Sequence, residues 1–159
     1  MSKNQYYSIP VKLGDAMHGK QLTQTRTRTA IHQNIKLMLK AKPLSYRFDP
    51  TFGCLANKYY AHTPAQKKSE RLWREEIRES LQQNLRDLLQ RYESRVSAKD
   101  VIVDLLEPKA KDKRQVVKLK VEMTGHLTLG SRERFHYPDS EIADDAQEAL
   151  PLVIPVGAK

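Results

Sequence analysis

Residues 73–106 read WREEIRESLQQNLRDLLQRYESRVSAKDVIVDLL, and the spacing of apolar residues changes within this segment. Its first part has apolar residues at steps of four, four, four, three and four: Trp73, Ile77, Leu81, Leu85, Leu88 and Tyr92. This spacing predicts an α-helix with one apolar stripe along about six turns. After Arg95 the pattern becomes alternating, with Val101, Val103 and Leu105 opposite Ile102, Asp104 and Leu106, which predicts a strand. A helix that leads directly into a strand indicates an α+β domain.

Charged residues fill the remaining positions of this helix, which we expect to begin at Pro64. Opposite charges lie three or four positions apart, as in Arg71 with Glu75 and Glu75 with Arg78. Such pairs stabilise an exposed helix face slightly. We therefore interpret the charged residues mainly as a solvated face.

A second, longer alternation follows from Val117 to Leu129 and predicts a strand with one buried and one wet side. Its apolar side comprises Val117, Leu119, Val121, Met123, Gly125, Leu127 and Leu129. Gly125 interrupts the large side chains, which indicates a bulge or a close backbone approach. A turn at Gly130 and Ser131 leads to a third strand at 133–137, in which Phe135 and Tyr137 share a face.

On the N-terminal side, residues 25–41 predict another amphipathic helix. Its apolar face comprises Ala30, Ile31, Ile35, Met38 and Leu39, and we expect Arg26, Arg28, His32, Lys36 and Lys40 mostly elsewhere. Pro43 ends the helix. Residues 44–57 mix aromatic, charged, Pro and Gly residues without a period, which predicts an ordered loop.

These elements predict two helices packed on a small, mostly antiparallel sheet. We divide the chain into an extended lead-in and loop (1–23), an α+β domain (24–138) and a tail (139–159). The tail is acidic and then apolar. Two prolines keep its apolar piece, residues 150–156, out of a sheet interior, but that piece could lie along an edge or a partner.

The composition is that of a folded domain with a polar surface: 159 residues, 39% hydrophobic and 30% charged. No apolar run approaches the ~18 residues of a transmembrane helix, and the N-terminus lacks the apolar region of a secretory signal. Cys54 is the single cysteine, which excludes an intrachain disulfide and a cysteine-based zinc cluster. We therefore expect a cytoplasmic protein without direct membrane insertion.

The charge is unevenly distributed along the chain. Residues 1–138 carry 27 basic and 14 acidic side chains, whereas the tail carries five acids and one Lys. A basic body suggests an acidic partner, which could be nucleic acid, a membrane surface or another protein. The acidic tail makes nucleic acid the less favoured of these, because its carboxylates compete with phosphate for the same surface.

The residues give little sign of an active site. The five histidines lie far apart, without the spacing of a metal site, and no phosphate-binding glycine motif occurs. Glycoside hydrolysis needs two carboxylates across a cleft, but Glu75 and Glu76 point in different directions and Glu93 has no evident second acid. Cys54 fits a small buried filler better than a nucleophile. We therefore expect no catalysis, cofactor, metal or small-molecule substrate.

Aromatic residues gather in and after the first loop at Tyr46, Phe48, Phe52, Tyr59 and Tyr60, beside Arg47 and Lys58. Basic residues interleaved with aromatics are a feature of nucleic-acid-binding surfaces. The same cluster also suits an aromatic-anchored loop or a protein interface, so it supports a nucleic-acid-binding module only weakly.

Two motifs carry a resemblance to a known family. Arg28, Ile31, Asn34 and Ile35 lie on the first helix, and the loop segment from Arg47 to Cys54 follows as Arg-Phe-Asp-Pro-Thr-Phe-Gly-Cys. After the long helix comes Tyr92-Glu93-Ser94-Arg95, and then two strands. Over about residues 24–138 the chain resembles the gene twenty-five-like baseplate wedge family, whose type VI secretion member is called TssE. Ser94 stands where the family has Pro, which leaves the turn less rigid.

The resemblance implies a structural wedge subunit of a contractile injection machine, in a cytoplasmic baseplate at the inner membrane. Its partners would be TssF- and TssG-like wedge proteins and a sheath subunit. The family's older label implies a peptidoglycan-cleaving muramidase instead. The expected wedge-docking residues are Tyr92, Glu93, Arg95, Arg47, Phe48, Asp49, Pro50, Phe52 and Gly53. The strand at 116–129 and its neighbours would receive a sheath strand, with Leu119, Val121, Met123, Gly125 and Leu127 as its binding residues.

Each of these roles has a plainer alternative. The loop segment could merely hold the two helices together, and Glu93 with Arg95 could form an intrachain cap or salt bridge. If the pair docks a partner, charge reversal at Glu93 or Arg95 should block wedge assembly and leave the fold intact.

Overall fold

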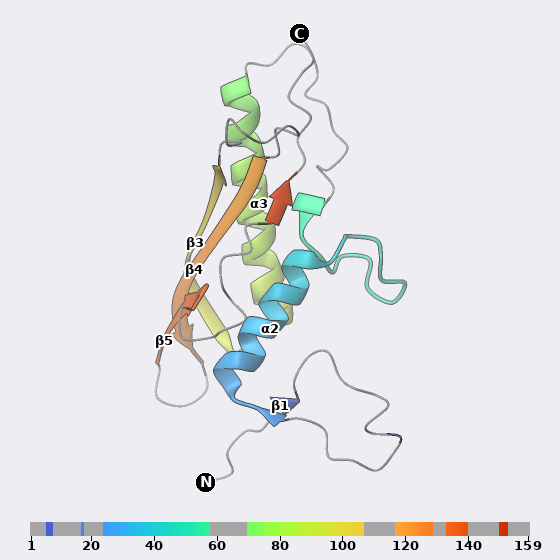
Figure 1. Cartoon of the computed structure of the whole chain (residues 1–159), viewed down its shortest axis with the longest axis vertical. Coiled ribbons are helices and arrows are strands. Elements are labelled where there is room, and N and C mark those ends of the chain that lie inside the picture. The colour runs from blue at the N-terminus through green and yellow to red at the C-terminus, as the bar shows by residue number, and fades with distance from the viewer. Residues whose placement is uncertain are drawn as a thin grey trace.

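The structure, a computed structural model, describes residues 6–7, 17, 24–57, 70–106, 117–128, 133–139 and 150–152. Its helices are α2 (Thr27–Lys40), the 3-10 turn η1 (Leu55–Asn57) and α3 (Glu70–Tyr92). Its strands are β1 (Tyr6–Tyr7), β2 (Gln24–Thr25), β3 (Val96–Leu106), β4 (Val117–Leu127), β5 (Arg134–Tyr137) and β6 (Leu150–Leu152). Figure 1 shows α2 and α3 on one side of the sheet, so the predicted α+β arrangement is confirmed.

The main sheet is antiparallel and has β4 at its centre. β3 pairs with β4 along its whole length, with Leu105 opposite Leu119 and Val101 opposite Met123. On the other edge of β4, β5 pairs at residues 123–126 and β6 pairs at residues 117–119. A separate two-stranded pair joins β1 to β2. Residues 150–152 of the apolar tail piece thus pair along an edge of β4, as Pro151 allows.

Gly125 marks a close backbone approach, as its position in the alternation predicts. The pairing of β3 with β4 shifts between Ala98 and Asp100, opposite this glycine. A Cβ atom at position 125 would lie 2.2 Å from the backbone oxygen of Ser97. Real Cβ atoms essentially never come this close to another heavy atom, so the bulge requires glycine here.

The core lies between the two helices and the inner face of the sheet. The predicted stripe of α3 is buried at Ile77, Leu81, Leu85 and Leu88, and Leu89 joins it. The sheet contributes Val101, Val103, Leu119, Val121, Met123 and Leu127, and α2 contributes Ile31, Ile35, Met38 and Leu39. Burying each such side chain stabilises the fold by about 1.5–3 kcal/mol, so this cluster is the main source of stability.

The expectations for the first helix need two corrections. The helix begins at Thr27, because Thr25 belongs to β2 and pairs with Tyr6. His32 is buried, although we expected it away from the apolar face, because α2 also packs against β5. Its ring lies 5.1 Å from Phe135 and 5.3 Å from Tyr137, centroid to centroid. The buried arc of α2 is therefore wider than its aliphatic stripe.

The start of α2 is tied to the first residue of β5 and to the segment just after that strand. The Arg28 guanidinium donates to the backbone oxygen of Arg134 and to the carboxylate of Asp139, at 3.1 and 3.4 Å. Asp139 is the first residue of the predicted tail. The expected helix start at Pro64 and the turn at 130–131 lie outside the described residues.

Candidate functional site

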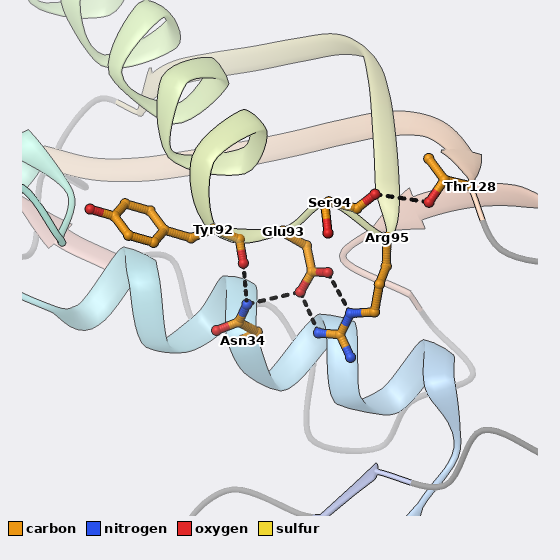
Figure 2. A network of polar contacts seen from close by, with 6 residues as sticks. All are labelled: Asn34, Tyr92, Glu93, Ser94, Arg95 and Thr128. Carbon is orange, nitrogen blue, oxygen red and sulfur yellow. Dashed lines mark hydrogen bonds and ion pairs between the residues drawn. The ribbon is translucent and has the colours of Figure 1, made fainter.

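The chain turns sharply where α3 ends and β3 begins, and a buried ion pair holds the turn (Figure 2). Arg95 donates two hydrogen bonds to the Glu93 carboxylate, from Nε to Oε1 at 2.6 Å and from a terminal nitrogen to Oε2 at 2.5 Å. Glu93 is only 1% exposed, whereas the Arg95 side chain is 20% exposed. A two-point contact of this kind fixes geometry as well as charge.

Two residues from other elements complete this turn. The Asn34 amide, on α2, donates to Glu93 Oε2 at 2.8 Å and to the backbone oxygen of Tyr92 at 3.2 Å. Thr128, just after β4, donates from its hydroxyl to the Ser94 oxygen and from its backbone N–H to the Arg95 oxygen, both at 2.8 Å. These bonds hold the turn at Ser94, where the family has Pro.

The intrachain alternative for Glu93 and Arg95 is therefore present in the structure. Charge reversal at Glu93 would place a cation against Arg95 in a site closed to water, so the fold would suffer as well. We therefore expect charge reversal at Glu93 to affect the fold as well as any docking. Any docking role of Glu93 would act through the turn that it holds, because its carboxylate is not accessible.

Arg95 is the accessible member of the pair. Its guanidinium lies over the ring of Tyr6 in β1, 4.7 Å from the ring centroid, which is a cation–π contact. The hydrogen bonds to Glu93 raise the pKa of Arg95 above its ordinary value, so the guanidinium stays charged. β1 is thereby fastened over the turn between α3 and β3.

The loop between α2 and η1 binds the same end of α3 through Tyr92. The Tyr92 hydroxyl donates to Asp49 Oδ2 at 2.6 Å, and Thr51 donates to Asp49 Oδ1 from its hydroxyl and its N–H. These hydrogen bonds lower the pKa of Asp49, and the bond from Tyr92 is the largest cause. Arg91 adds a bond to the Thr51 hydroxyl at 3.0 Å. The two motifs of the resemblance therefore meet at Tyr92.

Aromatic rings and a glycine fix the rest of the loop. The ring of Phe52 stands edge-on to Tyr46 and to Tyr92, with centroids 5.2 and 5.1 Å apart. Gly53 has a φ of +125°, and a Cβ there would lie 2.7 Å from the oxygen of Ala41. A larger residue would strain the backbone and collide with the end of α2. The loop is thus held against both helices.

The outermost part of this loop projects large side chains into solvent. Leu44, Tyr46 and Phe48 are exposed, and Phe48 is 100% exposed. We call these three residues the loop tip. Arg47 and Pro50, also predicted docking residues, are exposed beside it. A rigid loop that presents a fully exposed phenylalanine is a candidate contact surface.

The residues predicted to receive a sheath strand lie in the middle of the sheet. Leu119, Val121, Met123, Gly125 and Leu127 are all buried and face the helices. Among the described residues, β4 is paired with β3 on one edge and with β5 and β6 on the other, except at 120–122. The four side chains, and the backbone at Gly125, are closed off from direct contact with a partner. A partner strand would have to pair with the edge of a strand next to β4, such as the outer edge of β3.

Sequence reasoning missed the residues that tie the elements together. The sequence places Asn34 in the helix motif but predicts no role for it. It predicts no role for Thr51, Thr128 or Tyr6 in joining the elements. All four act through hydrogen bonds or a ring contact between distant segments. The polar Asn34 among the apolar residues of α2 was the one signal available.

The described residues contain no group of three or more His, Cys, Asp or Glu side chains suited to holding a metal ion. In the same part of the chain, no helix is both long enough and apolar enough to cross a membrane.

The fold and the site define a small α+β protein in which a preformed, aromatic loop is locked to a helix end. The family described as "Baseplate wedge protein gp25" matches residues 25–128, which is most of the chain. This protein belongs to that family of structural baseplate proteins, and the resemblance is confirmed.

Two solved structures are similar to this chain. The anti-feeding prophage baseplate, determined by cryo-electron microscopy, contains a chain with 15% identity and a TM-score of 0.51, covering 78% of this chain and 85% of that one. A protein of Geobacter sulfurreducens described as a tail lysozyme has 14% identity and a TM-score of 0.49, covering 73% and 90%. No curated protein matches this chain in sequence.

Proposed function

We propose that this protein is a structural wedge subunit in the baseplate of a contractile injection machine of the type VI kind. In this role it joins TssF- and TssG-like wedge proteins and provides the start point for the sheath. It works in the cytoplasm, in a baseplate docked at the inner membrane. Family membership and the baseplate chain of similar fold support this proposal. The observation that carries it is the rigid junction at Tyr92, which joins both motifs and presents the loop tip.

The loop tip is the docking surface that we assign to wedge partners. Exposed Phe48 and Tyr46 supply the aromatic area that dominates protein interfaces. Asp49 and Phe52 do not contact the partner in this proposal but hold the loop in its bound shape, through Tyr92. Because the loop is ordered beforehand, little conformational entropy is lost on binding.

Glu93 and Arg95 have a supporting role in the same surface. Their ion pair fixes the turn after α3, and Tyr92 precedes that turn directly. A shift of the turn would therefore move the aromatic contact with Phe52 as well. We propose that the pair sets the orientation of the docking loop, with the edge of the Arg95 guanidinium as a further contact.

Sheath initiation is proposed to occur by strand addition at the main sheet. β3 pairs only with β4 among the described residues, so its other edge offers unpaired backbone groups. We therefore propose that the sheath strand binds at this edge of β3 and not at the β4 residues that the sequence suggested. The strand that docks there is proposed to come from a sheath subunit.

A catalytic or nucleic-acid-binding role has less support. Glu93 is the buried carboxylate of the described core, and Arg95 holds both of its oxygens. A glycosidase acid must reach the glycosidic bond of its substrate, and the buried, fully bonded Glu93 carboxylate is not accessible to one. The basic body alone would suit nucleic acid, but it suits acidic protein partners equally.

The test is co-expression of a tagged chain with the TssF- and TssG-like proteins encoded beside it, followed by purification and native mass measurement. The wild-type chain should recover both proteins. Phe48→Ala should reduce recovery by about 30-fold, the effect of a hot spot of about 2 kcal/mol. Leu72→Ala, an exposed apolar residue on α3, is the matched control and should recover them normally. If the wild-type chain recovers neither protein, the wedge role is refuted. If the Phe48→Ala variant recovers both proteins as well as the wild-type chain does, only the assignment of the loop tip as the docking surface is refuted.

A further inference from the structure

β1 lies apart from the main sheet, near the N-terminal end of α2 (Figure 1). Its Tyr6 pairs with Thr25 and its Tyr7 pairs with Gln24, and β2 leads almost directly into α2. Among the described residues, the core cluster takes no side chain from β1 or β2. An isolated two-stranded pair is at best marginally stable in water. β1 therefore depends on its other contacts for its place on the domain.

The contact between Tyr6 and Arg95 joins β1 to the turn after α3. The half-buried Tyr6 ring covers the face of the guanidinium, whereas Glu93 bonds its edge. Glu93 is the largest cause of the raised pKa of Arg95, and a hydrogen bond with Tyr6 raises that pKa further. Tyr6 thus engages the part of the guanidinium that Glu93 does not use. With this ring in place, the Arg95 side chain is 20% exposed.

The junction between β2 and α2 is weakly held. Arg26, the N-cap residue of α2, makes no side-chain hydrogen bond to the start of the helix, and the first turn of this helix carries no acidic residue. A capping side chain and an acid in the first turn would both stabilise a helix start. Arg28 is anchored to β5, so the weak point lies just before it. β1 and β2 can move together at this point without disturbing the core.

We propose that β1 is a strap that covers Arg95 in the isolated chain and is displaced when a wedge partner docks. The inference rests on the proposed function and deepens it, because it states how docking at Arg95 is regulated. Tyr6 and the partner compete for the same guanidinium, so the partner binds only the open form. Glu93 keeps Arg95 in position in both forms, because its two hydrogen bonds do not involve β1.

The strength of the closing contact sets the size of the effect. A cation–π contact at a partly exposed site favours the closed form by about two- to five-fold. The open fraction is then about 15–30%, and the apparent affinity for a partner falls by about three- to six-fold. A partner that also binds the loop tip can overcome a factor of this size. The strap therefore disfavours weak contacts made at Arg95 alone.

The test measures binding of the purified TssF- and TssG-like proteins to the immobilised full chain by biolayer interferometry. Tyr6→Leu removes the aromatic ring and keeps an apolar side chain. This variant should bind about three- to six-fold more tightly than the wild-type chain. The gain should lie in the association rate, with an unchanged dissociation rate, because the strap is open in the complex of either chain.

Two variants are the matched controls for this measurement. Tyr6→Phe keeps a ring over the guanidinium and should bind within about two-fold of the wild-type chain. Tyr7→Leu makes the same chemical change at the next residue of β1, whose ring is not the one over Arg95, and should bind as the wild-type chain does. Urea unfolding checks the fold: Tyr6→Leu should lower the midpoint by no more than about 0.6 M, because β1 lies outside the core.

Four results would overturn the strap. The first is a Tyr6→Leu variant that binds no more tightly than the wild-type chain, and the second is tighter binding that comes from slower dissociation. The third is an equal gain in Tyr6→Phe or Tyr7→Leu, because the ring over Arg95 would then not be the closing contact. The fourth is a much larger fall in the urea midpoint, which would make β1 an integral part of the fold.

Failure of the strap can be told apart from failure of the wedge role. If the wild-type chain binds the wedge proteins and Tyr6→Leu gives any of these four results, the strap is wrong and the wedge role stands. If neither the wild-type chain nor Tyr6→Leu binds either wedge protein, the wedge role is refuted and the strap falls with it.

Discussion

Replacing Arg95 by Met should destabilise the fold far more than its partial exposure suggests. The variant removes two hydrogen bonds, of 2.6 and 2.5 Å, from a carboxylate that is 1% exposed. Among the described residues, Asn34 would then be the side chain left to donate a hydrogen bond to Glu93. Breaking a buried pair from one side costs about 3–5 kcal/mol, because the remaining charge stays buried. Since the Arg95 side chain is 20% exposed, we expect the lower end, about 3 kcal/mol.

Urea unfolding followed by circular dichroism measures this loss. With a slope of about 1.5–2 kcal/mol per M, the midpoint should fall by about 1.5–2 M. Arg71→Met is the matched control, because Arg71 also pairs with a glutamate but its side chain is 88% exposed. That variant should lose no more than about 0.5 kcal/mol. Glu93→Gln combined with Arg95→Met should lose less than the sum of the single changes, because no charge is left buried.

Equal effects of Arg95→Met and Arg71→Met would refute the reasoning. Glu93 would then have to be in contact with water in solution, and the turn after α3 would not depend on its ion pair. Additive losses in the double variant would lead to the same conclusion, since a coupled pair must show an interaction energy.

Three further changes test separate parts of the fold. Gly125→Ala should lower the free energy of unfolding by about 1–3 kcal/mol, because its Cβ would overlap the Ser97 oxygen, and a thermal melt unchanged from wild type would contradict the predicted bulge. Tyr92→Phe should raise the pKa of Asp49 in a carboxyl NMR titration, since the hydroxyl bond is the first cause of its low value. Because that pKa is lowered on folding, the loop contact is complete above the unfolded value of about 3.9 and is lost as pH falls through the folded value. Cys54, buried and with a pKa raised to about 11, should react with a thiol reagent at pH 8 only as fast as the protein opens, and immediate labelling would show that the loop is not closed over it.

The fold class was predictable because it rests on local periods. The stripe from Ile77 to Leu88 and the alternation from Leu119 to Leu127 each repeat within one element, so burial follows from the sequence directly. The close backbone approach at Gly125 could also be predicted from the sequence, because a glycine there interrupts a row of large side chains on a buried face. These features need no knowledge of which elements are neighbours.

The rest depends on pairing between distant segments, which no local period encodes. β4 became the centre of the sheet because β5 and β6 share its second edge, so the side chains thought to receive a partner are internal. His32 is buried because of where β5 lies. The loop and the helix-end motif could be recognised separately, but their meeting at Tyr92 is visible only in three dimensions.

The meeting of loop and turn at Tyr92 has a mechanical consequence. A pull on Phe48 passes through Asp49 and Phe52 to the last turn of α3, and from there through Arg95 and Thr128 into the sheet. Every step of this route is a short polar bond, a ring contact or the chain itself, with no hinge between them among these residues. In a particle that contracts, such a subunit would transmit strain from one neighbour to the next instead of absorbing it.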